Sequence, residues 1–149
     1  MIYRNFIDRK LYLYYMAGFK KILLVEDDPI SLMIVTRLME ISNFSIQVET
    51  AENGLIACNI LQKCKVENLL LPEIILLDLR MGIMDGWEFL DWYNEFSKDI
   101  IAIPPVYILS STIDDSDTKL ASTYKQVKGF ISKPITTEHL KEIMEENQV

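Results

Sequence analysis

Carboxylates, hydroxyl groups and an ammonium group follow short apolar runs of this sequence, at Glu26, Asp27, Asp28, Asp78, Ser110, Ser111 and Lys133. Crowded carboxylates repel each other unless a cation lies between them, and a set of hard oxygen ligands favours Mg²⁺. A carboxylate beside such an ion can act as a nucleophile and form an acyl phosphate. Lysine and serine side chains can bind the phosphate oxygens. Brought together, these residues would perform metal-assisted phosphoryl transfer onto Asp78.

Apolar runs indicate the strands that must position these side chains. Four runs are short, partly β-branched and bounded by charges, proline or glycine, which is typical of strands buried on both faces. A fifth stretch alternates polar and apolar residues and predicts a half-exposed edge strand. The buried runs cover residues 22–25, 74–77, 106–109 and 130–131, and the edge strand covers residues 46–49.

Apolar residues at helical spacing fill the intervals between the strands. The predicted helices cover residues 29–41, 53–63, 85–96, 116–124 and 137–146. Five repeats of strand and helix predict an α/β fold, with a parallel sheet, helices on both faces and right-handed crossovers. Ligands of such sheets bind outside the carboxyl ends of the strands, so the polar side chains are predicted to meet at one rim. A single acid after a strand would more often be a solvated loop residue or a helix cap. The predicted site therefore depends on the observation that all of these polar side chains follow strands of one sheet.

Five stretches of the sequence resemble the motifs of receiver domains in two-component response regulators. They cover residues 22–29, 51–57, 75–86, 105–111 and 129–134, and the likeness extends from Lys20 to about Glu146. The resemblance implies a CheY-like, flavodoxin-like fold, which is a doubly wound sheet of five parallel strands in the order 2-1-3-4-5. Gly82 stands where a proline is frequent in that family, and residues 62–72 and 97–104 form longer segments than usual.

The resemblance also assigns roles at the rim of the sheet. Asp78 would be the phosphoacceptor. Glu26, Asp27, Asp78 and the backbone carbonyl of Arg80 would bind Mg²⁺ or Mn²⁺. Asp27 would be a direct ligand of the metal, and Glu26 would act through water.

A second group of residues would bind the phosphoryl group and report its presence. Lys133 and Ser110 would contact the phosphate, and the bond between Lys133 and Pro134 would be cis. Ser110 and Phe130 would form a switch, in which the hydroxyl group moves toward the phosphoryl group and the aromatic ring turns inward.

The implied function needs protein partners. A histidine kinase or a histidine phosphotransferase would donate the phosphoryl group in a phosphorelay. The signal would leave through contact with an unidentified downstream protein, and a phosphorylation-dependent homodimer is compatible with the resemblance. No linker follows the last predicted helix, so we expect no attached output domain. Such a module phosphorylates and dephosphorylates itself and is not a turnover enzyme.

Length and composition limit the class of protein. The 149 residues suit one domain, and half of them are hydrophobic while a quarter are charged, as in soluble globular proteins. The net charge of -7 opposes nucleic-acid binding. No apolar run approaches the roughly 18 residues of a membrane helix, so we expect no membrane insertion. Cys58 and Cys64 are interpreted as free thiols, which fits a cytoplasmic protein.

The first residues lie outside the likeness. We interpret residues 1–17 as an N-terminal extension and residues 18–149 as the receiver domain. The extension lacks the order of charged and apolar residues that defines a signal peptide. Two interpretations stay open: a mis-assigned upstream start, because Met16 suits a natural beginning, or a poorly ordered arm.

Two other functions compete with phosphoacceptance. A phosphatase of the haloacid-dehalogenase type also uses Mg²⁺ and an aspartate after a strand, but it needs a second aspartate two residues later, where this chain has Arg80. A flavodoxin-like nucleotide binder needs a phosphate loop rich in Gly, Ser or Thr after the first strand, where this chain has acids. A receiver that folds without signalling is disfavoured by the intact set of Asp78, Lys133 and the acidic pair.

Overall fold

Strands and helices alternate along the chain, as the apolar pattern predicts. The computed structural model describes residues 18–149, and the predicted N-terminal extension, residues 1–17, lies outside the described residues. The strands are β1 (Phe19–Val25), β2 (Ser45–Ala51), β3 (Ile74–Asp78), β4 (Val106–Ser110) and β5 (Val127–Ser132). The helices are α2 (Pro29–Ile41), α3 (Gly54–Val66), α4 (Gly86–Phe96), α5 (Asp115–Ala121) and α6 (Thr137–Glu146), with a short 3-10 helix, η1 (Ser97–Asp99), after α4. Within residues 18–149, no helix has the length and apolar character to cross a membrane.

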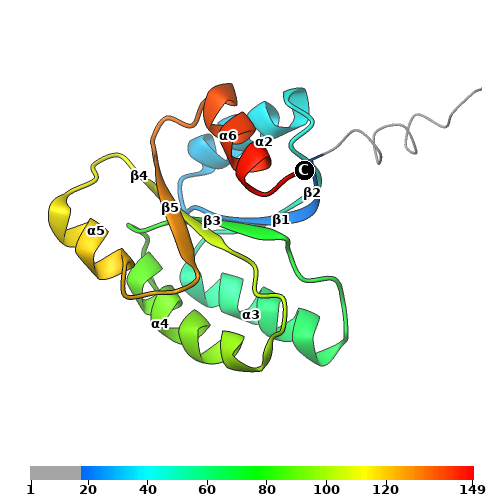
Figure 1. The fold of residues 1–149 in the computed structure, drawn as a ribbon, viewed down its shortest axis with the longest axis vertical. Helices are drawn as coiled ribbons and strands as arrows, with labels where there is room; N and C mark the ends of the chain where they lie inside the picture. The colour runs from blue at the N-terminus through cyan, green and yellow to red at the C-terminus, as the bar shows by residue number, and fades with distance from the viewer. Residues whose placement is uncertain (1–17) are drawn as a thin grey trace, which may run out of the picture.

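The five strands form one parallel sheet in the order β2-β1-β3-β4-β5. This order and direction confirm the predicted doubly wound fold. Helices α2 and α6 cover one face of the sheet, and α3, α4 and α5 cover the other (Figure 1). The register pairs Val25 with Leu77 and Asp78 with Leu109. The carboxyl ends of the central strands therefore lie level with each other.

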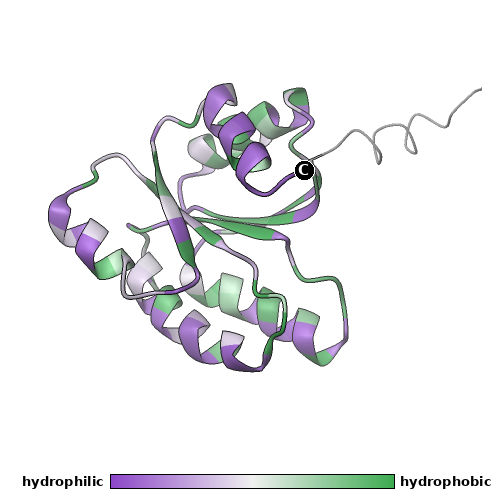
Figure 2. Cartoon of the chain, viewed as in Figure 1, coloured by the Kyte–Doolittle hydropathy of each residue, from purple (hydrophilic) through white to green (hydrophobic). Residues whose placement is uncertain are grey.

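Two apolar cores flank the sheet, one on each face. Leu23 and Val25 of β1 belong to the core beneath α3 and α4, whereas Ile22 and Leu24 belong to the core beneath α2 and α6. Strands β3 and β4 are buried along their whole length, as their apolar runs predict, while β2 is half exposed at the edge. Figure 2 shows the apolar strands in the middle layer and polar residues on the outer sides of the helices.

Several element boundaries differ from the sequence prediction, among them the end of α3, which lies at Val66 and not at residue 63. The apolar run of the first strand begins at residue 22, and we expect the strand itself to open at Lys20 or Lys21. β1 starts at Phe19, because its main chain pairs with β2 from Phe19 onward. The charge of Lys21 hides this start in the sequence, yet Lys21 is buried and its Nζ lies 2.7 Å from Oε2 of Glu49. β5 likewise starts at Val127 rather than at residue 130. Helix α5 ends at Ala121, before the predicted residue 124, because the next N–H groups bond in tight turns.

Side-chain caps fix the loops that follow β1 and β3. Asp28 accepts hydrogen bonds from the backbone N–H groups of Ile30, at 3.1 Å, and Ser31, at 3.3 Å. Asp85 and Glu88 form a capping box at the start of α4. Such caps satisfy N–H groups that have no partner inside the helix. Both loops, which carry the predicted site, are therefore anchored to the first turn of a helix.

Candidate functional site

The sheet brings the five predicted site residues to one rim. Glu26 and Asp27 follow β1, Asp78 is the last residue of β3, Ser110 is the last residue of β4, and Lys133 follows β5. β1, β3, β4 and β5 are consecutive neighbours in the sheet. Because the strands are parallel, their carboxyl ends meet at the same edge.

Glu26, Asp27 and Asp78 form an acidic cluster at this rim. Glu26 is 1% exposed and Asp78 is 7% exposed, whereas Asp27 is open to solvent. Each residue offers one carboxylate oxygen, and these three oxygens lie within 4.8 Å of one another. Like charges at this separation repel each other, so the donor set fits a divalent cation with a preference for oxygen ligands.

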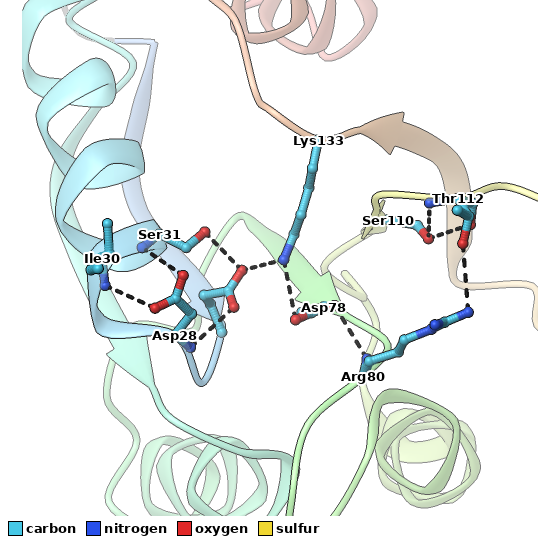
Figure 3. A network of polar contacts seen from close by, with 9 residues as sticks. Asp28, Ile30, Ser31, Asp78, Arg80, Ser110, Thr112 and Lys133 are labelled. Carbon is cyan, nitrogen blue, oxygen red and sulfur yellow. Dashed lines mark hydrogen bonds and ion pairs between the residues drawn. The ribbon is translucent and has the colours of Figure 1, made fainter.

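Lys133 faces the cluster with the opposite charge. Its Nζ lies 2.5 Å from Oε2 of Glu26. The same Nζ lies 3.1 Å from Oδ2 of Asp78 (Figure 3). Glu26 also accepts hydrogen bonds from the backbone N–H of Asp28, at 3.1 Å, and from the hydroxyl group of Ser31, at 3.0 Å. Burial lowers the pKa of Lys133, but the hydrogen bond to Glu26 and the charges of Asp78 and Glu26 outweigh burial and raise it. Lys133 is therefore held in its charged form.

Burial raises the pKa of the Asp78 carboxyl group above its ordinary value. The backbone N–H of Arg80, which donates to Oδ1 at 3.2 Å, and the charge of Lys133 oppose this rise, and the charge of Glu26 adds to it. A divalent cation beside Asp78 would favour the ionised form, which is the form that acts as a nucleophile.

Arg80 links the loop after β3 to the loop after β4. Its Nη2 lies 3.5 Å from Oγ1 of Thr112 (Figure 3). The guanidinium group is exposed, and Arg80 lines a cavity of about 450 Å³ together with Asp27, Asp85 and Trp87. Because Asp27 belongs to both, this cavity adjoins the acidic cluster.

Ser110 and Phe130 stand apart from the acidic cluster in this arrangement. Ser110 is buried, donates to the carbonyl oxygen of Thr112 at 2.5 Å and accepts from the N–H of Thr112 at 3.3 Å. Its hydroxyl group is therefore engaged in its own loop (Figure 3). Phe130 lies on β5 and is half buried against the core beneath α3 and α4. The peptide bond between Lys133 and Pro134 is cis.

Two residues at the site were missed by sequence reasoning. The hydroxyl group of Ser31 orients Glu26, and Thr112 holds both Ser110 and the guanidinium group of Arg80. Their only signal in the sequence is proximity, since Ser31 lies in the first turn after the acidic run and Thr112 lies two residues after Ser110. Hydroxyl residues at such positions usually cap helices or turns, so this signal is weak.

Comparison with known proteins connects this geometry to a family. A family model described as the response regulator receiver domain matches residues 22–145. The chain is 34% identical over 125 residues to the probable methanogenesis regulatory protein FilR2 of Methanothrix harundinacea, covering 84% of this chain and 79% of that protein. A two-component response regulator from Cytophaga hutchinsonii superposes with a TM-score of 0.78 at 25% identity, covering 86% of this chain and 96% of the other. The Mn²⁺-bound form of response regulator Rcp1 superposes with a TM-score of 0.65 at 26% identity, covering 87% and 92%.

Proposed function

Because this chain belongs to the response regulator receiver family, we propose that it accepts a phosphoryl group on Asp78 within a two-component phosphorelay. The observation that carries the proposal is the setting of Asp78. It is buried at the end of β3, its Oδ2 lies 3.1 Å from Nζ of Lys133, and it shares an oxygen cluster with Glu26 and Asp27. A carboxylate in this setting has a fixed cation on one side and a set of metal ligands on the other.

The proposed reaction exchanges one bond to phosphorus for another. A carboxylate oxygen of Asp78 attacks the phosphorus of a phosphohistidine and forms a P–O bond. The P–N bond breaks, and the imidazole leaves with the electron pair and takes up a proton. Lys133 can pair with an oxygen of the transferring group and offset its charge. The ion pairs of Lys133 include Asp78 but not Asp27, so this charge favours Asp78 as the acceptor.

Mg²⁺ or Mn²⁺ would be held by Glu26, Asp27, Asp78 and the backbone carbonyl of Arg80. The convergence of three carboxylate oxygens supports this assignment, because hard oxygen ligands of like charge suit such ions. The Mn²⁺-bound form of Rcp1 supports an ion of this class in a protein of this fold. When bound, the ion supplies positive charge that stabilises the phosphoryl group during transfer.

Ser110 and Phe130 would convert phosphorylation into a change of shape. The hydroxyl group of Ser110 now donates to a neutral carbonyl, that of Thr112. A phosphoryl oxygen on Asp78 is a charged acceptor, and hydrogen bonds to charged groups contribute about 1.5–3 kcal/mol against about 1 for neutral ones. The hydroxyl group would therefore turn toward the phosphoryl group. β4 and β5 are paired, so the movement of the Ser110 hydroxyl group would change the position of the Phe130 ring.

The donor would be a histidine kinase or a histidine phosphotransferase that docks beside the site. Ile30, Met33 and Ile34 on α2 are exposed apolar residues. A cleft of about 360 Å³ lies next to them, lined by Ile34, Lys133 and Pro134 among others. An apolar helix face beside the acceptor fits the helical surface around a phosphohistidine, because amphipathic helices pack through such faces.

The output would leave by protein contact. We propose a downstream protein as the recipient, reached directly or through a phosphorylation-dependent homodimer. We propose the cytoplasm as the compartment, which agrees with two free, buried cysteines, Cys58 and Cys64. We propose that the chain is not a turnover enzyme, since the guanidinium group of Arg80 stands where a phosphatase of the haloacid-dehalogenase type needs a proton donor.

Phosphorylation in vitro tests this function. Incubation with Mg²⁺ and acetyl phosphate should add the mass of one phosphoryl group, and the product should be labile to hydroxylamine, as acyl phosphates are. Asp78→Asn should abolish the gain. Asp117→Asn, a matched change at an acid that lines the neighbouring cavity, should leave it intact. An Asp78→Asn protein that gains the mass at the wild-type rate would show the assignment to be wrong. Multiple turnovers of p-nitrophenyl phosphate would instead favour a phosphatase.

A further inference from the structure

An apolar groove lies at the end of the sheet opposite Asp78, where the strands begin. Its volume is about 670 Å³, and its walls are residues 68–73, which lead into β3, and residues 102–104, which lead into β4. We call it the amino-edge groove. All wall residues except Glu73 fall within residues 62–72 and 97–104, the two segments that we expect from the sequence to be longer than usual in the family. Glu73 is the one ionisable residue among those that line it, and most of the others are apolar.

The leucines of the groove are held outward by polar contacts of their own backbone. Leu69 is 49% exposed and Leu70 is 58% exposed. Asn68 ends the turn after α3 with a φ of 52°, and the N–H of Leu69 donates to the carbonyl of Cys64 at 2.9 Å. The buried ammonium group of Lys21 donates to the carbonyl of Leu70 at 3.1 Å. The apolar surface is therefore fixed in place, and a fixed apolar surface of this kind marks a docking site.

The groove adjoins the point where the chain enters the sheet. The N–H of Lys20 donates to Oε2 of Glu73 at 2.6 Å, and the N–H of Glu73 donates to the carbonyl of Lys21 at 2.8 Å. β1 is the neighbour of β3, and β3 is the neighbour of β4. Adjacent strands lie about 4.8 Å apart, so the beginning of β1 lies within roughly 10 Å of both walls.

We propose that residues 1–17 of this chain occupy the amino-edge groove. This segment is rich in Tyr, Leu and Ile, which match the apolar walls. It carries three cations, Arg4, Arg9 and Lys10, against a single acid, Asp8, and Glu73 offers these cations an acidic partner at the groove. An extended chain spans about 3.3 Å per residue, so the segment reaches far beyond the roughly 10 Å required.

The covalent connection favours this occupant over a second molecule. A tethered segment reaches an effective concentration on the order of millimolar at a nearby site. A second copy of the chain or another protein must compete with it. Residues 1–17 therefore cover the exposed leucines and keep this end of the molecule from associating, while the rim around Asp78 stays open.

NMR of two proteins tests the proposal, the full chain and a shortened chain that starts at Met16. Removal of the segment should shift the amide signals of residues 68–73 and 102–104 and leave those of the rim around Asp78 unchanged. In the full chain, a nitroxide label at Phe6→Cys should broaden the signals of residues 69–71. The label should react selectively, because Cys58 and Cys64 are buried.

A pair of leucine variants supplies the control. Leu70→Glu should abolish the broadening at the groove. Leu55→Glu, at a leucine that is 46% exposed at the other end of α3, should keep it. Broadening that is absent, or that falls on other residues, overturns the proposal. A mixing experiment tests for a second copy: one set of chains carries the nitroxide but no ¹⁵N, and the other carries ¹⁵N but no nitroxide. Broadening of the ¹⁵N-labelled signals in this mixture also overturns the proposal, since the groove would then bind a second copy. An intact mass of the native protein that begins at Met16 overturns it as well.

Discussion

Replacement of Lys133 by methionine should destabilise the protein strongly without a divalent cation and weakly with one. Lys133 is the cation that contacts both Glu26 and Asp78 in the described structure. Methionine keeps much of the length and apolar volume of the lysine side chain but removes its charge. The buried carboxylate of Glu26 then loses its ionic partner and keeps only the hydrogen bonds from Asp28 and Ser31.

The size of the effect follows from burial. Removing one partner of a fully buried ion pair costs about 3–5 kcal/mol. The side chain of Lys133 is 24% exposed, and Glu26 keeps two other hydrogen bonds, so we expect a loss of about 2–3 kcal/mol in the free energy of unfolding. For a domain of this length, each kcal/mol lowers the midpoint of thermal unfolding by about 3–4 °C. The midpoint should therefore fall by roughly 6–12 °C.

Thermal unfolding followed by circular dichroism, in EDTA and in millimolar Mg²⁺, measures this loss. Mg²⁺ should reduce this loss, because removal of the lysine charge beside Glu26 and Asp78 strengthens the binding of a cation to their carboxylates. A tenfold lower dissociation constant adds about 1.4 kcal/mol of stabilisation in the variant over that in the wild type when the ion is in excess. Lys141→Met is the control, since Lys141 is exposed and its ion pair with Glu145 is worth at most about 1 kcal/mol. A loss in Lys133→Met that is equal in EDTA and in Mg²⁺, or no larger than that of the control, would refute the reasoning.

Four other variants give separate tests. Asp78→Asn should stabilise the protein in EDTA at neutral pH, because burial raises the folded-state pKa of Asp78 and the ionised carboxylate therefore costs stability above that pKa. The gain in stability should shrink as the pH falls toward the unfolded-state pKa of about 3.9. A gain that grows on acidification would contradict this pH dependence. Asp27→Ala should lose the rise in thermal midpoint that Mg²⁺ produces in the wild type, which differential scanning fluorimetry would show. Ser110→Ala should still be phosphorylated on Asp78, but NMR with beryllofluoride should show shifts confined to the rim instead of spreading along β5; equal spreading in both proteins would point to another route. Tyr93→Phe should lower the free energy of unfolding in urea by about 1 kcal/mol and leave phosphorylation unchanged, because its buried hydroxyl group donates to the carbonyl of Pro104 at 2.8 Å.

The central strands and their order could be predicted because burial on both faces leaves a clear record in the sequence. β3 and β4 are apolar along almost their whole length, and parallel strands with helical crossovers admit few topologies. The apolar run alone does not reveal the start of β1, because Lys21 reads as a solvated residue; the expected opening at Lys20 or Lys21 came from the family resemblance. Its burial depends on Glu49 from β2 and on the carbonyl of Leu70, both distant in the sequence.

The same distinction applies to the site. The rule that parallel strands end at one edge predicts that Asp78, Lys133 and the acids after the first strand come together, and the family resemblance selects Glu26 and Asp27 among those acids. It gives no information on which hydrogen bonds each side chain then forms. Ser110 bonds to Thr112 because the loop after β4 turns back on itself, and Lys133 lies nearer Glu26 than Asp78. Which hydrogen-bond partner each side chain takes depends on the detailed conformation of its loop. The periodicity of apolar residues in the sequence carries no information on that conformation.

Charge at the rim would couple a bound cation to a phosphoryl group on Asp78. Glu26, Asp27 and Asp78 carry three formal negative charges and Lys133 one positive charge, so the rim has a net charge near -2, which a divalent cation cancels. Phosphorylation removes the charge of the Asp78 carboxylate and adds about 1.5 to 2 negative charges, as for other phosphorylated side chains, so the rim becomes more negative. The phosphorylated protein should therefore bind the cation more tightly than the unmodified protein. Linkage is reciprocal, so the cation must favour phosphorylation by the same factor. A titration that gave equal Mg²⁺ affinities for the unmodified protein and for its beryllofluoride complex would contradict this coupling, and with it the sharing of Asp78 between metal and phosphoryl group.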